Sequence, residues 1–288
     1  DAQQKVRRKW TYRPLVGGLP TSHLLKGDVL EDVRLLRFRK LKGEVTLRMT
    51  ILRKKDVVLG PVDIGRVNLD DIPQADDTAI DVIRIATYAH QMDEALRLLD
   101  RCLEQGFETF MNVMAVSTLA PDDVDTFLTK LASSGVHNVA LVDSFGALYP
   151  YHVRYLVHKY MNYLGERIKV GVHFHNNQQQ AFANSIAAID EGVDFVDATL
   201  HGIGRGAGNC PLELLLFYLD NPKYNVRPIL DLVEEFAAMR DELRWGYHLP
   251  YAISGFFNIH PRSAIDRMAR ADRYQVREMY ESLLGRKG

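Results

Sequence analysis

Hydrophobic positions along this chain follow two different spacings. Short runs with apolar side chains at every second position predict strands, and longer runs with apolar side chains three and four residues apart predict helices. Strands are predicted at residues 44–52, 80–88, 107–117, 136–143, 168–174 and 193–199. Helices are predicted between the later strands, at residues 92–106, 121–134, 150–164 and 178–191. Such regular alternation predicts a parallel α/β sheet, either doubly wound or closed as a (β/α)8 barrel.

Both ends of the chain depart from this alternation. A basic, irregular start contains one expected helix at 29–39, and residues 53–79 are expected to form a turn-rich loop. A short helix is predicted at 211–220. The end of the chain predicts further helices at 227–243, 261–270 and 274–284, with an aromatic-rich connection after the first of these. We therefore divide the chain into an N-terminal segment, an α/β barrel catalytic domain and a C-terminal helical extension, with bounds 1–43, 44–225 and 226–288.

Polar side chains occur where successive predicted strands end. Active sites of parallel α/β folds lie at the carboxyl ends of strands, and barrel enzymes draw their residues from several strands. Each side chain could instead bind a neighbouring loop, but their joint placement favours the barrel. The set contains Arg84, Asn112, Asp143, Ser144, His173, His175 and Thr199, followed by a glycine-rich turn with Gly204, Gly206 and Asn209.

His173 and His175 stand two residues apart at the end of the fifth predicted strand. Side chains at positions i and i+2 of a strand share a face, so both imidazoles are expected to project toward one point. Converging imidazoles suit a divalent metal, although such a pair also occurs as a purely structural feature. The polar residues that follow, and the glycine-rich turn ending in Asn209, favour a metal or anion site. That turn lacks the layout of a dinucleotide-binding loop, so a dinucleotide site is excluded.

Composition narrows the class of protein further. The chain has 288 residues, 47% of them hydrophobic, which is ample for a full core. Its net charge of −1 argues against a dedicated nucleic-acid binder. Residues 1–55 carry 15 Lys and Arg against 5 Asp and Glu, which predicts a solvated basic face or a surface for a phosphate group or an acidic partner.

The compartment follows from what the sequence lacks. Cys102 and Cys210 provide no disulfide framework and fit a reducing cytoplasm. No apolar run approaches the ~20 residues of a membrane-spanning helix. The first ten residues have no hydrophobic segment behind their charges, so they do not form a secretory signal. We expect a cytoplasmic protein with no membrane partner.

Several stretches resemble a known group of enzymes. The most specific are VGVHFHNN, NSIAAIDEGVDFVDAT and GIGRGAGNCPLE, supported by DVIRIA, MNVM, LVDSFGALYP and WGYHLPY. They are similar to the DRE-TIM metallolyase superfamily of TIM-barrel enzymes, which contains HMG-CoA lyase, isopropylmalate synthase and 4-hydroxy-2-oxovalerate aldolase. The glycine-rich stretch is nearer the aldolase branch than the synthase branch. The resemblance covers roughly residues 44–270.

The resemblance implies a divalent metal bound by His173 and His175, with Asn209 at or beside it. The metal, Mn or Mg with Co or Zn as alternatives, would bind a 2-oxo acid and stabilise an enolate while a carbon–carbon bond is made or broken. Arg84 and Asp143 would position or polarise the substrate. The general base stays unassigned, with His248 and Tyr251 as fallback candidates. We expect substrate binding to involve Asn112, Ser144, Gly204 and Gly206.

One family motif is missing. D-x-T-x-R-D-G, which supplies a further metal ligand and an arginine on the first strand of the family, does not occur in residues 1–44. Six predicted strands are also two fewer than a closed barrel requires. The missing strands could belong to an absent N-terminal segment, come from another chain, or have been lost. Because an open six-stranded sheet exposes long edges, we favour the first two, and expect a homo-oligomer or a second chain that supplies the strands.

Three functions follow from these observations. The first is a divalent-metal-dependent carbon–carbon lyase of the aldolase type, acting on a small 2-oxo acid or aldehyde. The second is an acyl-CoA-dependent Claisen condensing enzyme, similar to isopropylmalate or citramalate synthase, in which the basic N-terminal third binds the CoA phosphates. The third is a non-catalytic barrel subunit that has lost the first metal-ligand strand. Metal content separates the third from the others, and acetyl-CoA turnover separates the first two.

Overall fold

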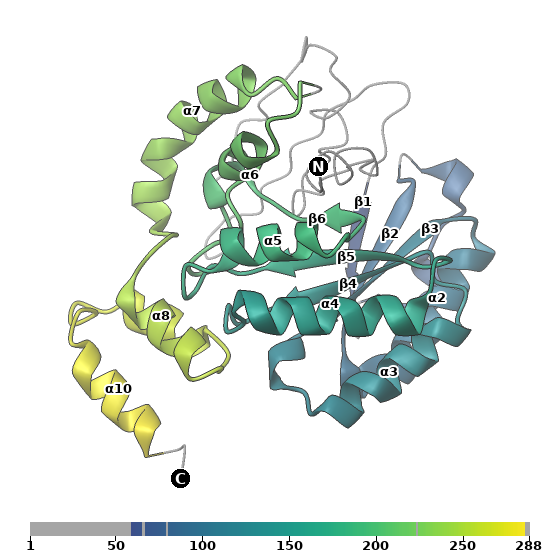
Figure 1. Cartoon of the computed structure of the whole chain (residues 1–288), viewed down its shortest axis with the longest axis horizontal. Helices are drawn as coiled ribbons and strands as arrows, with labels where there is room; N and C mark the ends of the chain where they lie inside the picture. The colour runs from purple at the N-terminus through teal and green to yellow at the C-terminus, as the bar shows by residue number, and fades with distance from the viewer. Residues whose placement is uncertain (1–58, 65–66, 79, 223, 286–288) are drawn as a thin grey trace.

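The computed structural model describes residues 59–64, 67–78, 80–222 and 224–285. The segment 1–43, the helix predicted at 29–39 and the strand predicted at 44–52 lie outside these residues. Within them, six strands form one parallel sheet in chain order (Figure 1). The strands are β1 (Leu59–Asp63), β2 (Val82–Tyr88), β3 (Glu108–Met114), β4 (Asn138–Asp143), β5 (Lys169–Phe174) and β6 (Phe195–Val196).

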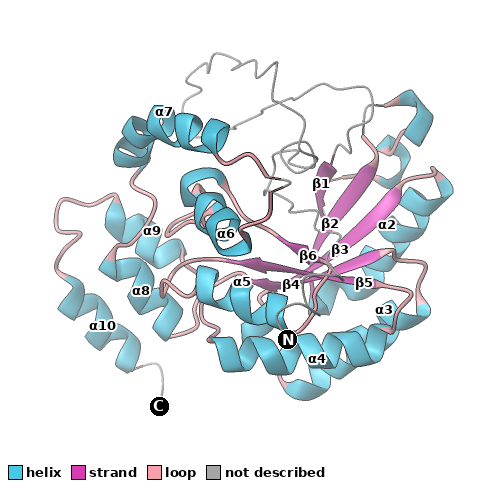
Figure 2. Ribbon diagram, turned by 45° about the horizontal axis from the view of Figure 1, so that its top comes forward, coloured by secondary structure: helices cyan, strands magenta, loops and turns pink. Residues whose placement is uncertain are grey.

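Helices connect the strands and extend the chain beyond the sheet. The connecting helices are α2 (Met92–Glu104), α3 (Pro121–Ser133), α4 (Pro150–Leu164) and α5 (Ala181–Asp190). The later helices are α6 (Leu212–Leu219), α7 (Arg227–Leu243), α8 (Leu249–Phe256), α9 (Arg262–Met268) and α10 (Val276–Leu284). Figure 2 shows α2 to α5 along the outer side of the sheet, with α8 to α10 grouped beside it.

The strand order decides between the two architectures that the sequence left open. A doubly wound sheet reverses its strand order at a switch point, whereas a barrel adds each strand beside the one before it. Every pair from β1–β2 to β5–β6 is parallel and consecutive. The fold is therefore of the (β/α) barrel type, with β1 and β6 at the two edges of the described sheet.

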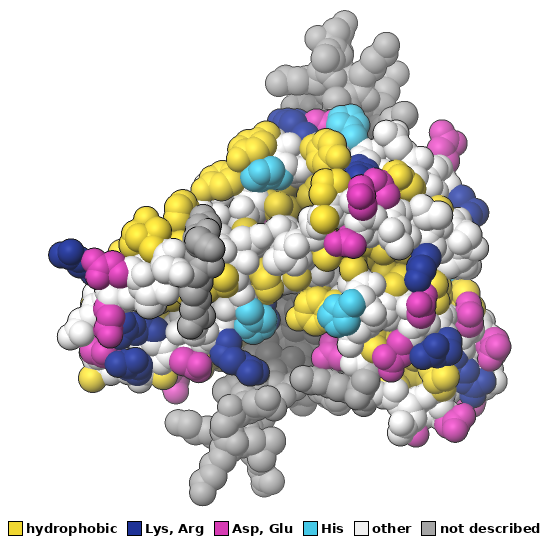
Figure 3. Space-filling model, turned by 90° about the horizontal axis from the view of Figure 1, so that it is seen from below, with side chains coloured by type: hydrophobic (Ala, Val, Ile, Leu, Met, Phe, Trp, Pro, Cys, Tyr) yellow, Lys and Arg dark blue, Asp and Glu magenta, His cyan; other side chains and the backbone are white. Residues whose placement is uncertain are grey.

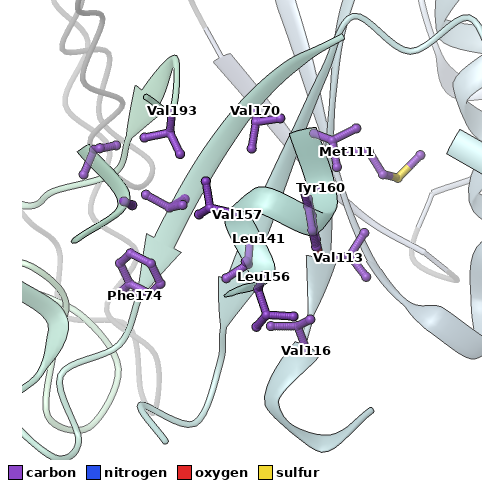
Figure 4. Packing of buried hydrophobic residues seen from close by; sticks show 14 of the residues in the cluster. Met111, Val113, Val116, Leu141, Leu156, Val157, Tyr160, Val170, Phe174 and Val193 are labelled. Atoms are coloured by element: carbon purple, nitrogen blue, oxygen red, sulfur yellow. The ribbon is translucent and has the colours of Figure 1, made fainter. Parts of the chain in front are cut away.

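Side chains on the two faces of the sheet differ in character. The outward face and the helices form the main hydrophobic core, in which residues of α4 pack on β3, β4 and β5. Figure 4 shows part of this packing, including Met111, Leu141, Leu156, Val157 and Tyr160. The inward face carries a smaller cluster made by Val82, Phe110, Ala140, Val142 and Phe195. Polar side chains continue this inward face toward the carboxyl ends of the strands.

Three elements differ from the sequence predictions. β1 lies in the segment predicted as a loop, because parallel pairing with β2 satisfies a backbone flanked by glycines. β6 has two residues, since only Phe195 and Val196 extend the ladder from β5. α8 lies inside the predicted aromatic connection. Its Pro250 and Gly255 resemble breakers, but proline suits a first helical turn and the glycine is buried against a neighbouring loop.

The C-terminal helices join two different clusters. Ile229 and Phe236 of α7 belong to the main core. α8 to α10 form a second cluster, which also contains Ala207 of the glycine-rich turn. The division of the chain at residues 225 and 226 stays a prediction. Across the described residues, none of the helices has the length and apolar character that crossing a membrane requires.

Candidate metal centre

The two predicted metal ligands lie side by side on the inward face of the sheet. His173 is in β5 and His175 follows it, and the ring centroids are 5.1 Å apart with the planes at 75°. Gly171, two residues earlier on the same face, leaves room for Phe110: an added Cβ would meet that ring at 2.9 Å. The inward face is thus apolar at mid-strand and becomes polar where β5 ends.

Asp197 orients His173 from behind. The His173 Nδ1 lies 2.8 Å from Asp197 Oδ2, so with Nδ1 donating its proton the Nε2 lone pair is free to bind a metal. A carboxylate in this position fixes the tautomer of a ligating histidine and increases its basicity. Asp197 is only 2% exposed, so the pair is shielded from water.

Arg84 neutralises Asp197 from the next layer of the site. Its terminal nitrogen Nη2 lies 2.7 Å from Asp197 Oδ2, and its Nε donates to Asn112 Oδ1 at 2.8 Å. The guanidinium also lies over the Phe110 ring, 4.6 Å from its centroid. Four segments of the sheet, β2, β3, β5 and the residues after β6, thereby contribute to one buried polar network.

The electrostatics of this network shift the pKa values of Asp197 and His175. Burial alone raises the pKa of Asp197, but Arg84 and His173 more than offset it, so the carboxyl pKa lies below its ordinary value. Burial, His173 and Arg205 together lower the pKa of His175 well below the ordinary value of histidine. The lowered pKa favours the neutral form of the His175 imidazole, which is the form that binds a metal.

The glycine-rich turn brings Asn209 to His175. The two residues form an isolated antiparallel bridge, and the Asn176 backbone N–H donates to Gly208 O at 2.8 Å. The turn needs its glycines: Gly208 has a φ of +83°, and an added Cβ would lie 2.1 Å from Gly202 O. At Gly204 an added Cβ would lie 2.6 Å from the Asn209 amide nitrogen.

The side chain of Asn209 leaves one oxygen available. Its Nδ2 donates to Ile203 O at 3.1 Å. Its Oδ1 is buried and has no hydrogen-bond partner among the described residues. A buried polar atom without a partner is costly, and a divalent cation beside His175 would satisfy it. Two imidazoles and an amide oxygen fit such an ion, which imidazole and oxygen donors bind.

No carboxylate completes this donor set within the part of the chain that the structure describes. No group of three or more His, Cys, Asp or Glu residues there is arranged to hold a metal. Asp197 is the acid of this network; its Oδ2 is shared by His173 and Arg84, and its Oδ1 has no hydrogen-bond partner among the described residues. The predicted donor set among the described residues is therefore two histidines and one asparagine, and their binding of a metal stays a prediction.

Asp143 takes a different position from the one predicted. It shares strand parity with Val139 and Leu141, which face the helices, so its carboxylate points away from the inward face. Its two oxygens accept backbone N–H groups of Ala147 at 3.0 Å and Leu148 at 2.9 Å. Burial raises the pKa of Asp143 to about 6, while those N–H groups act in the opposite direction. These contacts hold the turn after β4, and the catalytic role of Asp143 stays a prediction.

The remaining predicted residues support the site. Ser144 Oγ accepts the Ala115 N–H at 2.9 Å, which ties the ends of β3 and β4 together. Gly206, with a φ of +63°, faces the ring of Tyr251, 3.3 Å from an added Cβ. Burial raises the pKa of Tyr251, so it is a poor base. His248 caps α8, with its ring 6.0 Å from that of Tyr251.

Asp197 is the site residue that the sequence interpretation missed. It lies in the sixth predicted strand, DFVDAT, two positions after the inward-facing Phe195. That spacing places it on the same face as His173, one step beyond the last paired residues of β5 and β6. Strand parity together with the register of β5 and β6 identifies Asp197 as a site residue.

An apolar pocket lies beside this site. It occupies about 610 Å³ between the start of α4 and helices α8 and α10, and its lining includes Tyr149, Leu249, Phe256 and Tyr280. None of the predicted site residues lines it. Figure 3 shows hydrophobic side chains exposed on the side where α8 and α10 lie. The polar chemistry of the molecule is thus separate from this apolar surface.

Comparison with protein families now decides the relationship. The family model described as HMGL-like matches residues 61–240, a span that contains β2 to β6, both histidines and Asn209. The chain belongs to the HMGL-like family. The assignment agrees with the sequence resemblance to the metallolyase superfamily, which includes HMG-CoA lyase.

Curated members of the family are similar over much of this chain. The 4-hydroxy-2-oxovalerate aldolase of Thermomicrobium roseum is 33% identical over 221 residues, which cover 69% of this chain and 62% of the relative. The 4-hydroxy-2-oxohexanoate aldolase of Mycobacterium tuberculosis strain H37Rv is 34% identical over 229 residues, which cover 79% and 66%. The chain spans less than two thirds of the length of these relatives.

Solved structures support the same family and fold. The N-terminal domain of a protein described as an aldolase, from Bacteroides vulgatus, aligns with a TM-score of 0.62 at 29% identity, covering 77% of this chain and 76% of that one. The hydroxymethylglutaryl-CoA lyase of Pseudomonas aeruginosa aligns with a TM-score of 0.56 at 18% identity, covering 66% and 71%. The second similarity concerns the fold alone.

Proposed function

We propose that this protein is a divalent-metal-dependent carbon–carbon lyase of the aldolase type that acts on a 2-oxo acid. The observation that carries the proposal is the adjacent pair of His173 and His175 rings, with Asp197 behind the first and the partnerless Oδ1 of Asn209 on the segment bridged to the second. Relatives named as 4-hydroxy-2-oxo acid aldolases support the reaction class.

The residues have distinct tasks in this proposal. His173 and His175 hold the metal, and Asn209 contributes its oxygen. When bound, a divalent metal supplies Lewis-acid stabilisation of negative charge on the oxygens of a 2-oxo acid. Asp197 fixes the His173 ring, and Arg84 with Asn112 fixes Asp197. Arg84 is therefore a positioning residue, because its guanidinium is occupied by Asp197 and Asn112.

The glycine-rich turn and the turn after β4 shape the space above the metal ligands. Gly146, with a φ of +59°, allows the second turn to pack on the backbone after β5, since an added Cβ would lie 2.6 Å from Asn177 N. Asn177 in turn donates to Ser254 Oγ at 3.2 Å, which joins α8 to the same end of the sheet. A substrate bound at the metal would thus meet a wall whose backbone is fixed.

Metal content tests the first step. Purified protein incubated with Mn²⁺, Mg²⁺, Co²⁺ or Zn²⁺ and then desalted is expected to retain near-stoichiometric metal for at least one ion, measured by mass spectrometry. The double variant His173→Ala/His175→Ala should retain none. His158→Ala is the matched control, because that exposed histidine pairs with Glu191 on the helical side of the molecule. Equal metal retention by the double variant and the control would contradict the proposed site.

Substrate turnover tests the reaction. The metal-loaded protein is expected to release pyruvate from 4-hydroxy-2-oxo acids, detected by coupled reduction with lactate dehydrogenase, and the double variant should not. Parallel assays with acetyl-CoA and a 2-oxo acid, following free thiol, test the Claisen alternative. Thiol release without pyruvate release would contradict the lyase and favour a condensing enzyme. Bound metal without either activity would favour a non-catalytic subunit.

A further inference from the structure

A second arginine crosses the mouth of the site and differs from Arg84 in its surroundings. Arg205 stands between Gly204 and Gly206 in the glycine-rich turn, and its side chain is exposed. Its Nη2 donates to the Ser144 carbonyl at 2.9 Å. Ser144 directly follows β4, and the His175 N–H donates to the preceding Asp143 carbonyl. The guanidinium is thus anchored at the strand ends that carry the metal ligands.

The surroundings of Arg205 are positive. Arg205 and Arg262 both lower the pKa of His260, after burial, which is the largest cause. His260 lies on the connection between α8 and α9, and its ring packs edge-on against Phe145 with centroids 5.7 Å apart. Two exposed arginines from separate segments are therefore near enough to His260 to act on it electrostatically.

No acidic side chain neutralises this rim among the described residues. Several described arginines pair with an Asp or Glu, whereas Arg205 and Arg262 form no such ion pair with a described residue. The Ser144 carbonyl engages one nitrogen of Arg205 and leaves further N–H donors of its fork available. Desolvation by the surrounding protein lowers the pKa of Arg205, so its charge has already lost part of its hydration. A planar guanidinium that has lost part of its hydration and has free N–H donors suits a carboxylate.

We propose that Arg205 binds a second carboxylate on the substrate, so that the preferred substrates are 4-hydroxy-2-oxo acids whose aldehyde-derived half is itself anionic. This inference rests on the proposed function. The first carboxylate, next to the keto group, belongs to the metal side of the site. A carboxylate at the other end of a five-carbon acid would meet the positive rim, with Arg262 adding weaker long-range attraction.

The reaction keeps its balance for such a substrate. The bond between C3 and C4 breaks, and its electron pair stays with C3, which takes up a proton to give pyruvate. The hydroxyl on C4 loses its proton and becomes the carbonyl of an aldehyde that carries the second carboxylate. One proton is lost and one is gained, and no oxidant or reductant is needed. Arg205 takes no part in these steps and determines only which aldehyde half is accepted.

Binding of two unreactive ligands tests the inference without turnover. 2-Oxoglutarate and 2-oxovalerate have the same chain length and differ by a carboxylate in place of a methyl group, and neither has the hydroxyl needed for cleavage. Calorimetric titration of the Mn²⁺-loaded protein is expected to give at least tenfold tighter binding of 2-oxoglutarate. Arg205→Gln should remove this preference while changing 2-oxovalerate binding less than twofold. Arg205→Lys should keep part of it, since it retains the charge but loses the fork.

Arg154→Gln is the matched control. Arg154 is an exposed arginine of α4 that pairs with Glu191 on the helical side of the molecule, and its loss should leave the preference unchanged. Equal binding of both ligands by the unsubstituted protein, equal weakening of both in Arg205→Gln, or no binding of either would overturn the inference.

Turnover separates this inference from the proposed function. Cleavage of 4-hydroxy-2-oxovalerate without any preference for 4-hydroxy-2-oxoglutarate would support the proposed lyase activity and contradict the role of Arg205. If the protein cleaves neither 4-hydroxy-2-oxo acid but shows an Arg205-dependent preference for 2-oxoglutarate, the anion site is supported and the lyase activity is contradicted. If the dicarboxylic acid is preferred both in binding and in kcat/KM, and Arg205→Gln loses this preference, the lyase activity and the role of Arg205 are both supported.

Discussion

Arg84 and Arg205 lie at the same end of one sheet in opposite environments. Arg84 is 7% exposed, contacts Asp197 and Asn112, and stacks over Phe110. Arg205 is exposed, donates to one backbone carbonyl and has no carboxylate partner among the described residues. The charge of the Arg84 guanidinium is neutralised by the protein itself, whereas the Arg205 guanidinium has N–H donors available for a ligand.

The difference shows how a site can use one residue type for two tasks. A buried charge is stable only when it is paired, so Arg84 and Asp197 form a fixed frame that sets the His173 ring. An exposed charge keeps part of its hydration, so Arg205 can remain without a partner until an anion arrives. Burial, rather than residue type, separates the framework from the recognition surface.

The largest expected effect comes from breaking the frame. Asp197→Asn removes the charge that neutralises Arg84 at nearly constant shape, and we expect a loss of about 3–5 kcal/mol in the free energy of unfolding, measured by urea denaturation. Arg205→Gln should change the same quantity by no more than about 0.5 kcal/mol.

Asp190→Asn is the control for this comparison, because that exposed acid forms a surface pair with Arg154 and a long hydrogen bond from Tyr218. A destabilisation of Asp197→Asn no greater than that of Asp190→Asn would show that the buried pair is not the frame. Metal affinity should also fall about 10–100-fold in Asp197→Asn, since the His173 ring loses its orienting carboxylate.

The second expected effect concerns the turn that carries both Arg205 and Asn209. Gly208→Ala combines a positive φ with a clash against Gly202 O, so we expect about 2 kcal/mol more destabilisation than in Gly165→Ala. Gly165 has a φ of +63° and a ψ of −167° with no atom within 4 Å of an added Cβ, so Gly165→Ala shows backbone strain of about 1–3 kcal/mol without a clash. Equal unfolding free energies for the two variants would contradict the close contact in the turn.

The third effect tests whether Asp143 belongs to the frame or to catalysis. Asp143→Asn replaces one acceptor oxygen by a donor facing the N–H groups of Ala147 and Leu148, which should cost about 1–3 kcal/mol. Activity per folded molecule should fall much less than it would for a residue that contacts the substrate. Asp122→Asn, at the exposed start of α3, is the control. A large loss of kcat with unchanged stability would restore the catalytic role predicted from the sequence.

The smallest effect concerns the outer part of the positive rim. Arg262→Gln should weaken 2-oxoglutarate binding about twofold to threefold, as expected for an exposed charge that acts at long range, and raised salt should reduce this difference. Calorimetry of the two proteins at low and high ionic strength measures it. A loss as large as that of Arg205→Gln would place Arg262, rather than Arg205 alone, in contact with the anion.

Much of this arrangement follows from local sequence patterns. Periodicity predicted five of the six described strands, and proline at the start of α3 and α4 marked where these helices begin. The H-x-H spacing predicted that His173 and His175 share a face. β1 and α8 were missed because glycine and proline gave breaker signals that tertiary pairing overrode.

The sequence by itself determined the β/α alternation, the shared strand face of the two histidines and the resemblance to the family, because these depend on spacing within single segments. Only the tertiary structure decided the roles of the charged residues. Strand register and parity place Asp197 beside His173 and turn the Asp143 carboxylate toward the N–H groups of the following turn. Arg84 was neutralised and Arg205 was not, because burial and partners come from distant segments that a linear pattern does not bring together.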